Sequence, residues 1–277
     1  MADIQIVTDS ASDLTPEIAK RYDIRIVPLS VSIGEEHYTD GVDLTAEEFY
    51  HKLRTVDALP RTSQPAPGRF ADVYREALDA GKQVLSIHIA SKLSGTYQAA
   101  CLAAEMVDLD NIVVVDSETA SMGVGLLAIA AARSSGSLAE AKEALAKAKE
   151  TLRLLFVPDT FEYMEKNGRI GKAASLAGSL LQIKPVLTIA GGTVEVVEKL
   201  RGRKRARRRI LDLFREQVGQ NKVHVAVLHA DAEEDAQEIL EEVQQTADCA
   251  ETYFTNVGPV IGSHAGPGVL GLVWHLA

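Results

Sequence analysis

QVLSIHIASKLSGTYQAACLAAEMVDLDNIVVVDS, residues 83–117, is the stretch of sequence that decides the fold. Two short runs within it, Gln83–Ile89 and Ile112–Val115, are rich in β-branched residues and have the length of buried strands. Ser94–Val107 lies between them and has the composition of a helix. Strand, helix and strand in this order predict two parallel strands with the helix packed on the sheet.

The same alternation extends toward the N-terminus. Ile4–Val7 and Arg25–Ile33 are predicted strands, and Thr45–Glu48 is a capping box that predicts the start of a helix. Phe70–Ala80 is a predicted helix that ends at a glycine. We therefore expect an N-terminal α/β domain over residues 1–152, with a parallel sheet covered by helices on both faces.

Downstream of that domain the pattern changes. Gly191 and Gly192 separate two strand-like runs, Pro185–Ile189 and Thr193–Val197, which predicts a hairpin and hence an antiparallel pair. We expect a second α/β domain over residues 153–277, with a mixed sheet. Helices are predicted over Phe161–Ile170, Arg203–Val218 and Ala236–Val243.

The composition is that of a globular protein, with 46% hydrophobic and 25% charged residues and a formal net charge of −10. This acidic balance disfavours broad binding to nucleic acid. Cys101 and Cys249 lie far apart in no metal-ligand spacing, which is typical of a reducing compartment. The N-terminus lacks the features of a secretion signal, and no apolar run is long enough to span a membrane. We expect a soluble cytoplasmic protein without integral membrane association.

Several small polar residues are candidates for ligand binding. Ser94 and Gly95 follow the strand Gln83–Ile89, and the ends of strands are where α/β folds bind ligands. Thr62 and Ser63 lie in a proline-rich loop, where the prolines would hold the hydroxyls in place. Each of these hydroxyls could equally cap a helix or complete an ordinary turn.

His264 lies within GSHAGPG, residues 262–268. Its neighbours have almost no side chain, so we expect the ring nitrogens to be open to a ligand. A lone histidine is otherwise more often structural.

The motifs of catalysis and of nucleotide binding are missing. Gly266–Gly271 matches GxGxxG in form, but it lies too near the C-terminus for the βαβ unit that this motif requires. Gly123 and Gly125 lie within a helical pattern and indicate close helix packing. The sequence has no GxxxxGK[ST], GxSxG or HExxH motif, and it gives no sign of a catalytic residue or a metal site.

Arg201–Arg209 is the one strongly basic stretch. It is typical of a solvated helix start. A docking patch for an acidic or nucleotide-bearing partner fits better than nucleic-acid binding, because no aromatic residues are interleaved.

Taken together, the chain resembles the DegV family of bacterial fatty-acid-binding proteins, which includes the binding subunits of fatty acid kinase. The matching pieces run in family order along nearly the whole chain. They are Val7–Ser10, Thr62–Pro65, Ser91–Tyr97, Asn167–Ile170, Lys184–Leu187, Arg201–Arg203 and His264–Gly268. Asn167, where many members have glycine, and Ala265, often a hydroxyl residue, depart from the family pattern.

The resemblance implies two α/β domains with a long-chain fatty acid buried between them and no other cofactor. The fatty acid carboxylate would meet Thr62, Ser94 and His264, with Ser63 and Gly95 beside them. Arg169 and Arg201 would lie at the mouth of the site and dock a partner.

The resemblance also implies that the partner is a separate ATP-dependent kinase subunit. The kinase would phosphorylate the presented acid to an acyl phosphate for phospholipid synthesis, and this chain would not be an enzyme by itself. Two alternatives stay open. One is a small-molecule kinase or phosphotransferase related to dihydroxyacetone kinase, with His264 holding a substrate. The other is a nucleic-acid-binding regulator that uses Arg201–Arg209.

Overall fold

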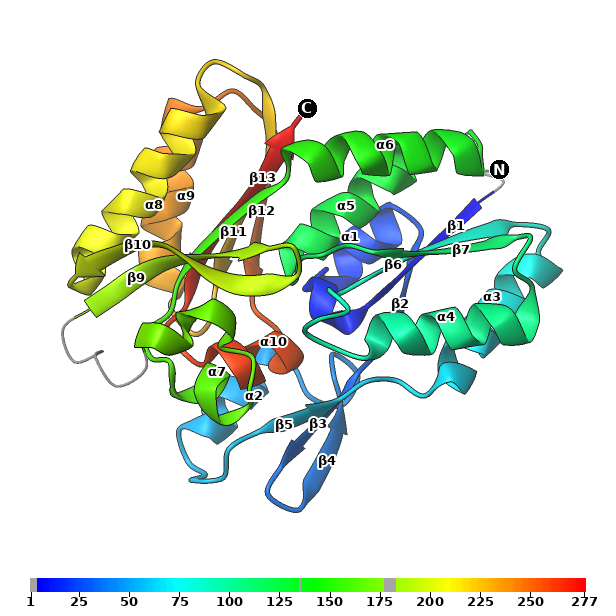
Figure 1. Ribbon diagram of the computed structural model, residues 1–277, viewed down its shortest axis with the longest axis horizontal. Coiled ribbons are helices and arrows are strands. Elements are labelled where there is room, and N and C mark those ends of the chain that lie inside the picture. Colours follow the sequence, from blue (N-terminus) through cyan, green and yellow to red (C-terminus); the bar gives the residue numbers. More distant parts are fainter. Residues whose placement is uncertain (1–3, 135, 177–182) are drawn as a thin grey trace.

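The computed structural model describes residues 4–134, 136–176 and 183–277, which form two main sheets and their covering helices (Figure 1). The first sheet is wholly parallel, with strand order β2-β1-β6-β7. Its strands are β1 (Ile4–Asp9), β2 (Ile24–Val27), β6 (Gln83–His88) and β7 (Ile112–Asp116).

The second sheet is mixed, with strand order β10-β9-β8-β13-β11-β12. Its one parallel pair is β11 with β12, and the other neighbours run antiparallel. Its strands are β8 (Arg153–Val157), β9 (Ile183–Ala190), β10 (Thr193–Arg201), β11 (Val223–His229), β12 (Cys249–Asn256) and β13 (Leu270–Leu276). A small antiparallel sheet contains β3 (Ser30–Ile33), β4 (Glu36–Thr39) and β5 (Arg61–Ser63).

The helices cover both sheets and separate them. They are α1 (Pro16–Arg21), α2 (Ala46–Leu53), α3 (Pro67–Asp79), α4 (Thr96–Val107), α5 (Met122–Arg133), α6 (Leu138–Thr151), α7 (Glu162–Lys166), α8 (Arg203–Val218), α9 (Glu233–Thr246) and α10 (Pro259–Ala265), with 3-10 turns η1 (Ser10–Ser12) and η2 (Gly171–Leu176). Helices α3 and α4 pack on the outer face of the parallel sheet, and α8 and α9 pack on the outer face of the mixed sheet (Figure 1). Helices α5 and α6 contact both sheets, so the largest apolar core lies between them.

This architecture confirms the predicted fold class, an α/β chain with one parallel and one mixed sheet. The hairpin at Gly191 and Gly192 is also confirmed, because β9 and β10 pair antiparallel across it. The division into domains at residue 152 stays a prediction.

Two predicted elements are wrong in extent. Arg25–Ile33 is not one strand but two, because Pro28 lies between β2 and β3 and has no N–H to donate to a strand ladder. The predicted helix Phe161–Ile170 is reduced to α7. It ends at Asn167, and Gly168 follows with a φ of 71°, a conformation that stops a helix.

Close packing explains the glycines of α5. A Cβ atom at Gly125 would lie 2.9 Å from the carbonyl oxygen of Ser12 and 3.0 Å from Cδ2 of Leu14. The helix therefore touches the backbone of η1, which confirms that this glycine permits close packing. Helix α5 is consequently fixed against the turn that follows β1.

We expect Gly125→Ala to lower the free energy of unfolding by about 2 kcal/mol, because the added Cβ atom would clash with the backbone of Ser12. Urea denaturation measures this change. Gly68→Ala in α3 is the matched control, because nothing lies within 4 Å of a Cβ atom at that position. A Gly125→Ala protein as stable as the control would show that the contact is not tight.

Candidate functional site

A cavity lies between the two sheets and encloses about 970 Å³ of space, including its mouth. Most of the lining is aliphatic or aromatic and comes from the inner faces of both halves of the chain. The lining includes Ile89 after β6, Leu154 and Phe156 of β8, Ile189 of β9, Val194 of β10 and Leu228 of β11.

Polar side chains also line the cavity, and they come from five separate segments, one of which is the start of α5 with Ser121. Thr62 comes from β5, and Gln64 follows that strand. Ser94 comes from the loop between β6 and α4, Arg169 from the turn after α7, and His264 from α10. The cavity therefore combines a long apolar wall with hydroxyl, amide, imidazole and guanidinium groups.

Thr62 and His264 contact each other directly. The Thr62 hydroxyl and Nε2 of His264 are 2.8 Å apart and share a hydrogen bond. Burial, with a smaller contribution from the charge of Arg169, lowers the pKa of His264 to about 4. The imidazole is therefore neutral near pH 7, so one ring nitrogen carries a proton and the other accepts. Its Nδ1 is buried and has no partner among the described residues.

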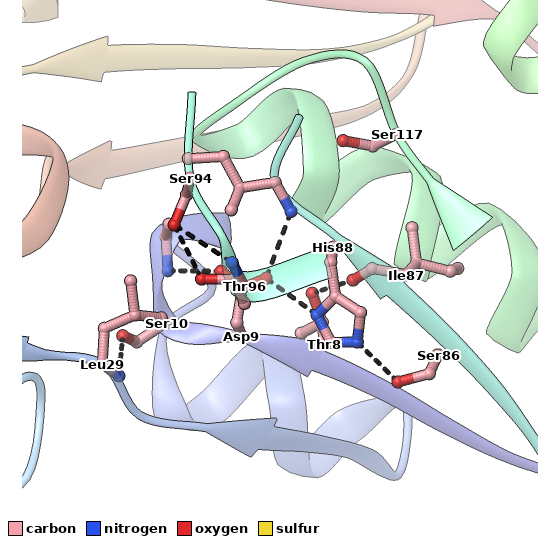
Figure 2. A network of polar contacts seen from close by, with 12 residues as sticks. Thr8, Asp9, Ser10, Leu29, Ser86, Ile87, His88, Ser94, Thr96 and Ser117 are labelled. Atoms are coloured by element: carbon pink, nitrogen blue, oxygen red, sulfur yellow. Dashed lines mark hydrogen bonds and ion pairs between the residues drawn. The ribbon is translucent and has the colours of Figure 1, made fainter. Parts of the chain in front are cut away.

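Ser94 is held at the corner between β6 and α4. Its N–H donates to the carbonyl of Ala90 at 3.1 Å, and its hydroxyl lies 2.8 Å from the hydroxyl of Thr96 (Figure 2). The N–H of Thr96 also donates to the Ser94 hydroxyl at 3.3 Å. Hydroxyls of this kind can donate to a carboxylate without adding a fixed charge to the cavity.

A buried polar network supports this corner from below (Figure 2). The Asp9 carboxylate accepts from Nδ1 of His88 at 2.8 Å and from the N–H of Ile89 at 3.1 Å. Nε2 of His88 is 2.6 Å from the Ser86 hydroxyl, which also accepts from Tyr74. The order of these groups resembles a hydrolytic triad. However, Asp9, Ser86, His88 and Tyr74 are all completely buried, so the network fixes the strand ends instead of meeting a substrate.

His264 occupies a different local structure from the one expected. It lies in the last turn of α10 and not in an open glycine-rich loop. Gly262 is required within this helix, because a Cβ atom there would lie 2.6 Å from the Tyr50 hydroxyl and 2.8 Å from Phe49. Gly266, with a φ of 78°, ends the helix against Tyr163. The glycines thus bring α10 close to α2 and α7 and do not expose the imidazole.

Of the residues expected to bind the carboxylate, Thr62, Ser94 and His264 line the cavity, whereas Ser63 and Gly95 do not. Alternation along β5 explains the absence of Ser63, because neighbouring residues of a strand point to opposite faces. Gly95 instead makes room for Gln64, whose amide would lie 2.7 Å from a Cβ atom at position 95. Gln64 was therefore missed, although two-residue spacing from Thr62 could have indicated it.

The two arginines expected at the mouth occupy different places. Arg169 lines the cavity and is exposed at its edge. Arg201 is exposed at the end of β10 and is not part of the lining.

The basic stretch is largely neutralised within the chain itself. Ion pairs join Arg203 and Arg207 to Asp235 at 2.9 Å each, and Arg208 to Glu242 at 3.0 Å. In the described part of the chain, Arg201, Lys204 and Arg205 form no ion pair. The surface therefore offers less free positive charge than the sequence suggests, which weakens the nucleic-acid alternative.

Two buried carboxyl groups near the cavity were also missed. Asp13 accepts hydrogen bonds from the N–H of Gly258, at 2.9 Å, and from the hydroxyl of Ser121. Burial raises the pKa of Asp13 to about 7, and burial likewise raises the pKa of Asp40 to about 7. Asp13 thus joins η1 to the start of α10, the helix that carries His264.

Residues 4–134, 136–176 and 183–277 contain neither a membrane-spanning helix nor a cluster of metal ligands. No helix there has the length and apolar character needed to cross a membrane. No group of three or more histidine, cysteine, aspartate or glutamate side chains is arranged to hold a metal ion.

The chain is similar to known proteins along its whole length. A family model described as an uncharacterised protein of the DegV family matches residues 3–276. A DegV domain-containing protein of Caldanaerobacter subterraneus subsp. tengcongensis is 36% identical over 276 residues, which cover 98% of each chain.

Solved structures of the same kind also match. One is a DegV family protein from Thermus thermophilus, described for its fatty acid binding. It has a TM-score of 0.93 and 38% identity, and the match covers 100% of both chains. Another is a stearic acid-binding protein from Eubacterium ventriosum. It has a TM-score of 0.90 and 30% identity, and the match covers 100% of this chain and 98% of that one.

Proposed function

This chain belongs to the DegV family, and we propose that it holds one long-chain fatty acid in the cavity between its two sheets. The carboxylate lies at Thr62, Ser94 and His264, and the acyl chain lies against the apolar wall. The single observation that carries this proposal is the cavity itself, which has a long apolar lining and a few polar groups. The fatty acids named for similar structures support it.

The binding free energy of a fatty acid in this cavity has an apolar part from the acyl chain and a polar part from the carboxylate. Burying about 14 methylene groups at about 0.8 kcal/mol each stabilises the complex by about 11 kcal/mol before ordering costs. A buried carboxylate is costly unless several donors converge on it. Hydroxyls of Thr62 and Ser94 supply such donors. If His264 donates Nε2–H to Thr62, the Thr62 hydroxyl is free to donate to the ligand.

The test is calorimetric titration of delipidated protein with palmitic acid and with its methyl ester. We expect the acid to bind more tightly, because the ester lacks the negative charge that the donors stabilise. Equal affinity for acid and ester would show that the polar groups do not recognise a carboxylate.

We further propose that the bound acid is presented to a separate ATP-dependent kinase that forms an acyl phosphate. Arg169 supports this, because its guanidinium is exposed at the cavity edge and is available to a phosphorylated partner group. Arg201 is a second exposed cation on the same half of the chain and makes no ion pair within the described residues. Cytoplasmic location and a role in phospholipid synthesis follow from the same proposal.

We expect Arg201→Glu to lower kinase-dependent acyl-phosphate formation at least about tenfold while fatty acid affinity stays unchanged. Charge reversal at a docking surface repels the partner but does not alter a cavity that Arg201 does not line. The assay combines the protein, its bacterial kinase, ATP and palmitic acid. Arg75→Glu, an exposed arginine on α3, is the control for charge alone. Equal loss in both variants would remove the docking role of Arg201.

A further inference from the structure

The carboxylate site is assembled from segments that lie far apart in the sequence. Thr62 and His264 are joined by their own hydrogen bond, but Ser94 makes no hydrogen bond to either of them among the described residues. The two hydroxyls, with the imidazole that orients one of them, recognise one carboxylate only if their positions are fixed within a fraction of an ångström. Another group must therefore hold these segments in fixed positions relative to one another.

Asn167 contacts two of the segments at once. Its side-chain Nδ2 donates to the carbonyl of Ser263 at 2.8 Å and to the carbonyl of Pro60 at 3.3 Å. Ser263 precedes His264 in α10, and Pro60 lies two residues before Thr62. One amide thus ties the backbone beside His264 to the backbone beside Thr62.

Arg169 extends the connection to the third segment. Its Nη1 donates to the carbonyl of Asn167 at 2.7 Å, and its Nε donates to the carbonyl of Leu93 at 3.2 Å. Leu93 directly precedes Ser94. The three carboxylate-binding segments are therefore all bonded, through backbone carbonyls, to one short turn.

The turn has a fixed shape that aims both side chains. Asn167 ends α7, and Gly168 follows in the left-handed conformation with a φ of 71°. The N–H of Arg169 donates to the carbonyl of Met164 at 2.8 Å, which closes the turn in the manner of a Schellman motif. The side chain of Asn167 is consequently directed by backbone geometry.

We propose that Asn167 is a positioning residue of the carboxylate site, acting through Pro60 and Ser263 to set the distance between Thr62 and His264. This inference rests on the proposed function and deepens it. The chemistry of the position is specific, because both partners of the side chain are acceptors. An amide offers two N–H donors to two carbonyls, whereas an aspartate of the same shape would repel both.

The test compares palmitic acid with 1-hexadecanol, which has the same tail without the carboxylate, in wild type, Asn167→Leu and Asn167→Asp. We expect each variant to bind palmitic acid about tenfold more weakly and to bind 1-hexadecanol as wild type does. Asn221→Leu is the matched control, because Asn221 also donates to a backbone carbonyl, that of Val218 at 2.9 Å, but at the end of α8. If Asn167→Leu does not fold, the affinities are measured with Asn167→Asp, which keeps the side-chain shape.

The outcomes separate the two claims. Unchanged affinity for palmitic acid in the Asn167 variants would overturn the positioning role, as would an equal loss for acid and alcohol. Failure of the wild-type protein to bind palmitic acid would remove the proposed function, and this inference with it.

Discussion

Replacing Thr62 by Val and Ser94 by Ala in one chain is expected to weaken palmitic acid binding at least about 100-fold. In the proposed complex each hydroxyl donates to a charged group in a partly buried site, and such a hydrogen bond contributes about 1.5–3 kcal/mol. Valine keeps the shape of threonine and alanine removes one oxygen, so the apolar wall is preserved. Calorimetric titration of delipidated protein measures the change.

The control for the double variant is Ser63→Ala, because Ser63 is exposed, neighbours Thr62 and does not line the cavity. We expect its affinity to match that of wild type. Loss of affinity in the control alone would place the carboxylate on the other face of β5. An unchanged double variant would show that the two hydroxyls do not bind the ligand.

Asp13→Asn is expected to raise the free energy of unfolding at pH 8 and to reduce the pH dependence of stability. Burial raises the pKa of Asp13 from 3.8 to about 7, so the folded state favours the neutral carboxyl group. The stability that this group contributes is present below pH 3.8 and is lost as the pH rises through 7. The loss for one such group is up to about 4 kcal/mol. Asparagine is neutral at every pH and can still accept from Gly258 and donate to Ser121.

Urea denaturation of both proteins from pH 4 to pH 8 measures this effect. Asp40, whose pKa is also about 7, keeps part of the dependence in the variant, so we expect a smaller slope and not a flat profile. Asp110→Asn, at an exposed position, is the control and should leave the slope unchanged. A variant that is less stable than wild type at pH 8 would show that Asp13 is needed as an anion.

The fold was predictable because its signals are local. Alternating strands and helices around Gln83–Ser117 depend on side-chain pattern alone. The hairpin turn requires positive φ angles, and Gly191 and Gly192 both adopt them. Local signals failed where one residue decides the outcome. Pro28 divides Arg25–Ile33, whose side-chain pattern predicts one strand. Gly168 ends a helix whose side-chain pattern continues to Ile170.

The candidate site was predictable only in part, because its segments meet through tertiary contacts. Thr62, Ser94 and His264 were ligand-binding candidates from the sequence pattern, and their role toward a carboxylate came from the resemblance to a family. The structure brings all three to one cavity. The contacts of Asn167 with Pro60 and Ser263 have no sequence signal, since they join residues about 100 positions apart. The burial of Asp13 likewise has no sequence signal, because it depends on tertiary packing against Ser121 and Gly258.

Mass spectrometry of a solvent extract from the purified protein tests the central claim most directly, with an unrelated protein purified alongside. Binding of a fatty acid in the cavity predicts a near-stoichiometric fatty acid in the extract and none above background in the control. The chain length found would also show which acyl group the apolar wall prefers. A protein that is empty and also fails to take up added palmitic acid would contradict the claim and favour a small polar substrate in the same cavity.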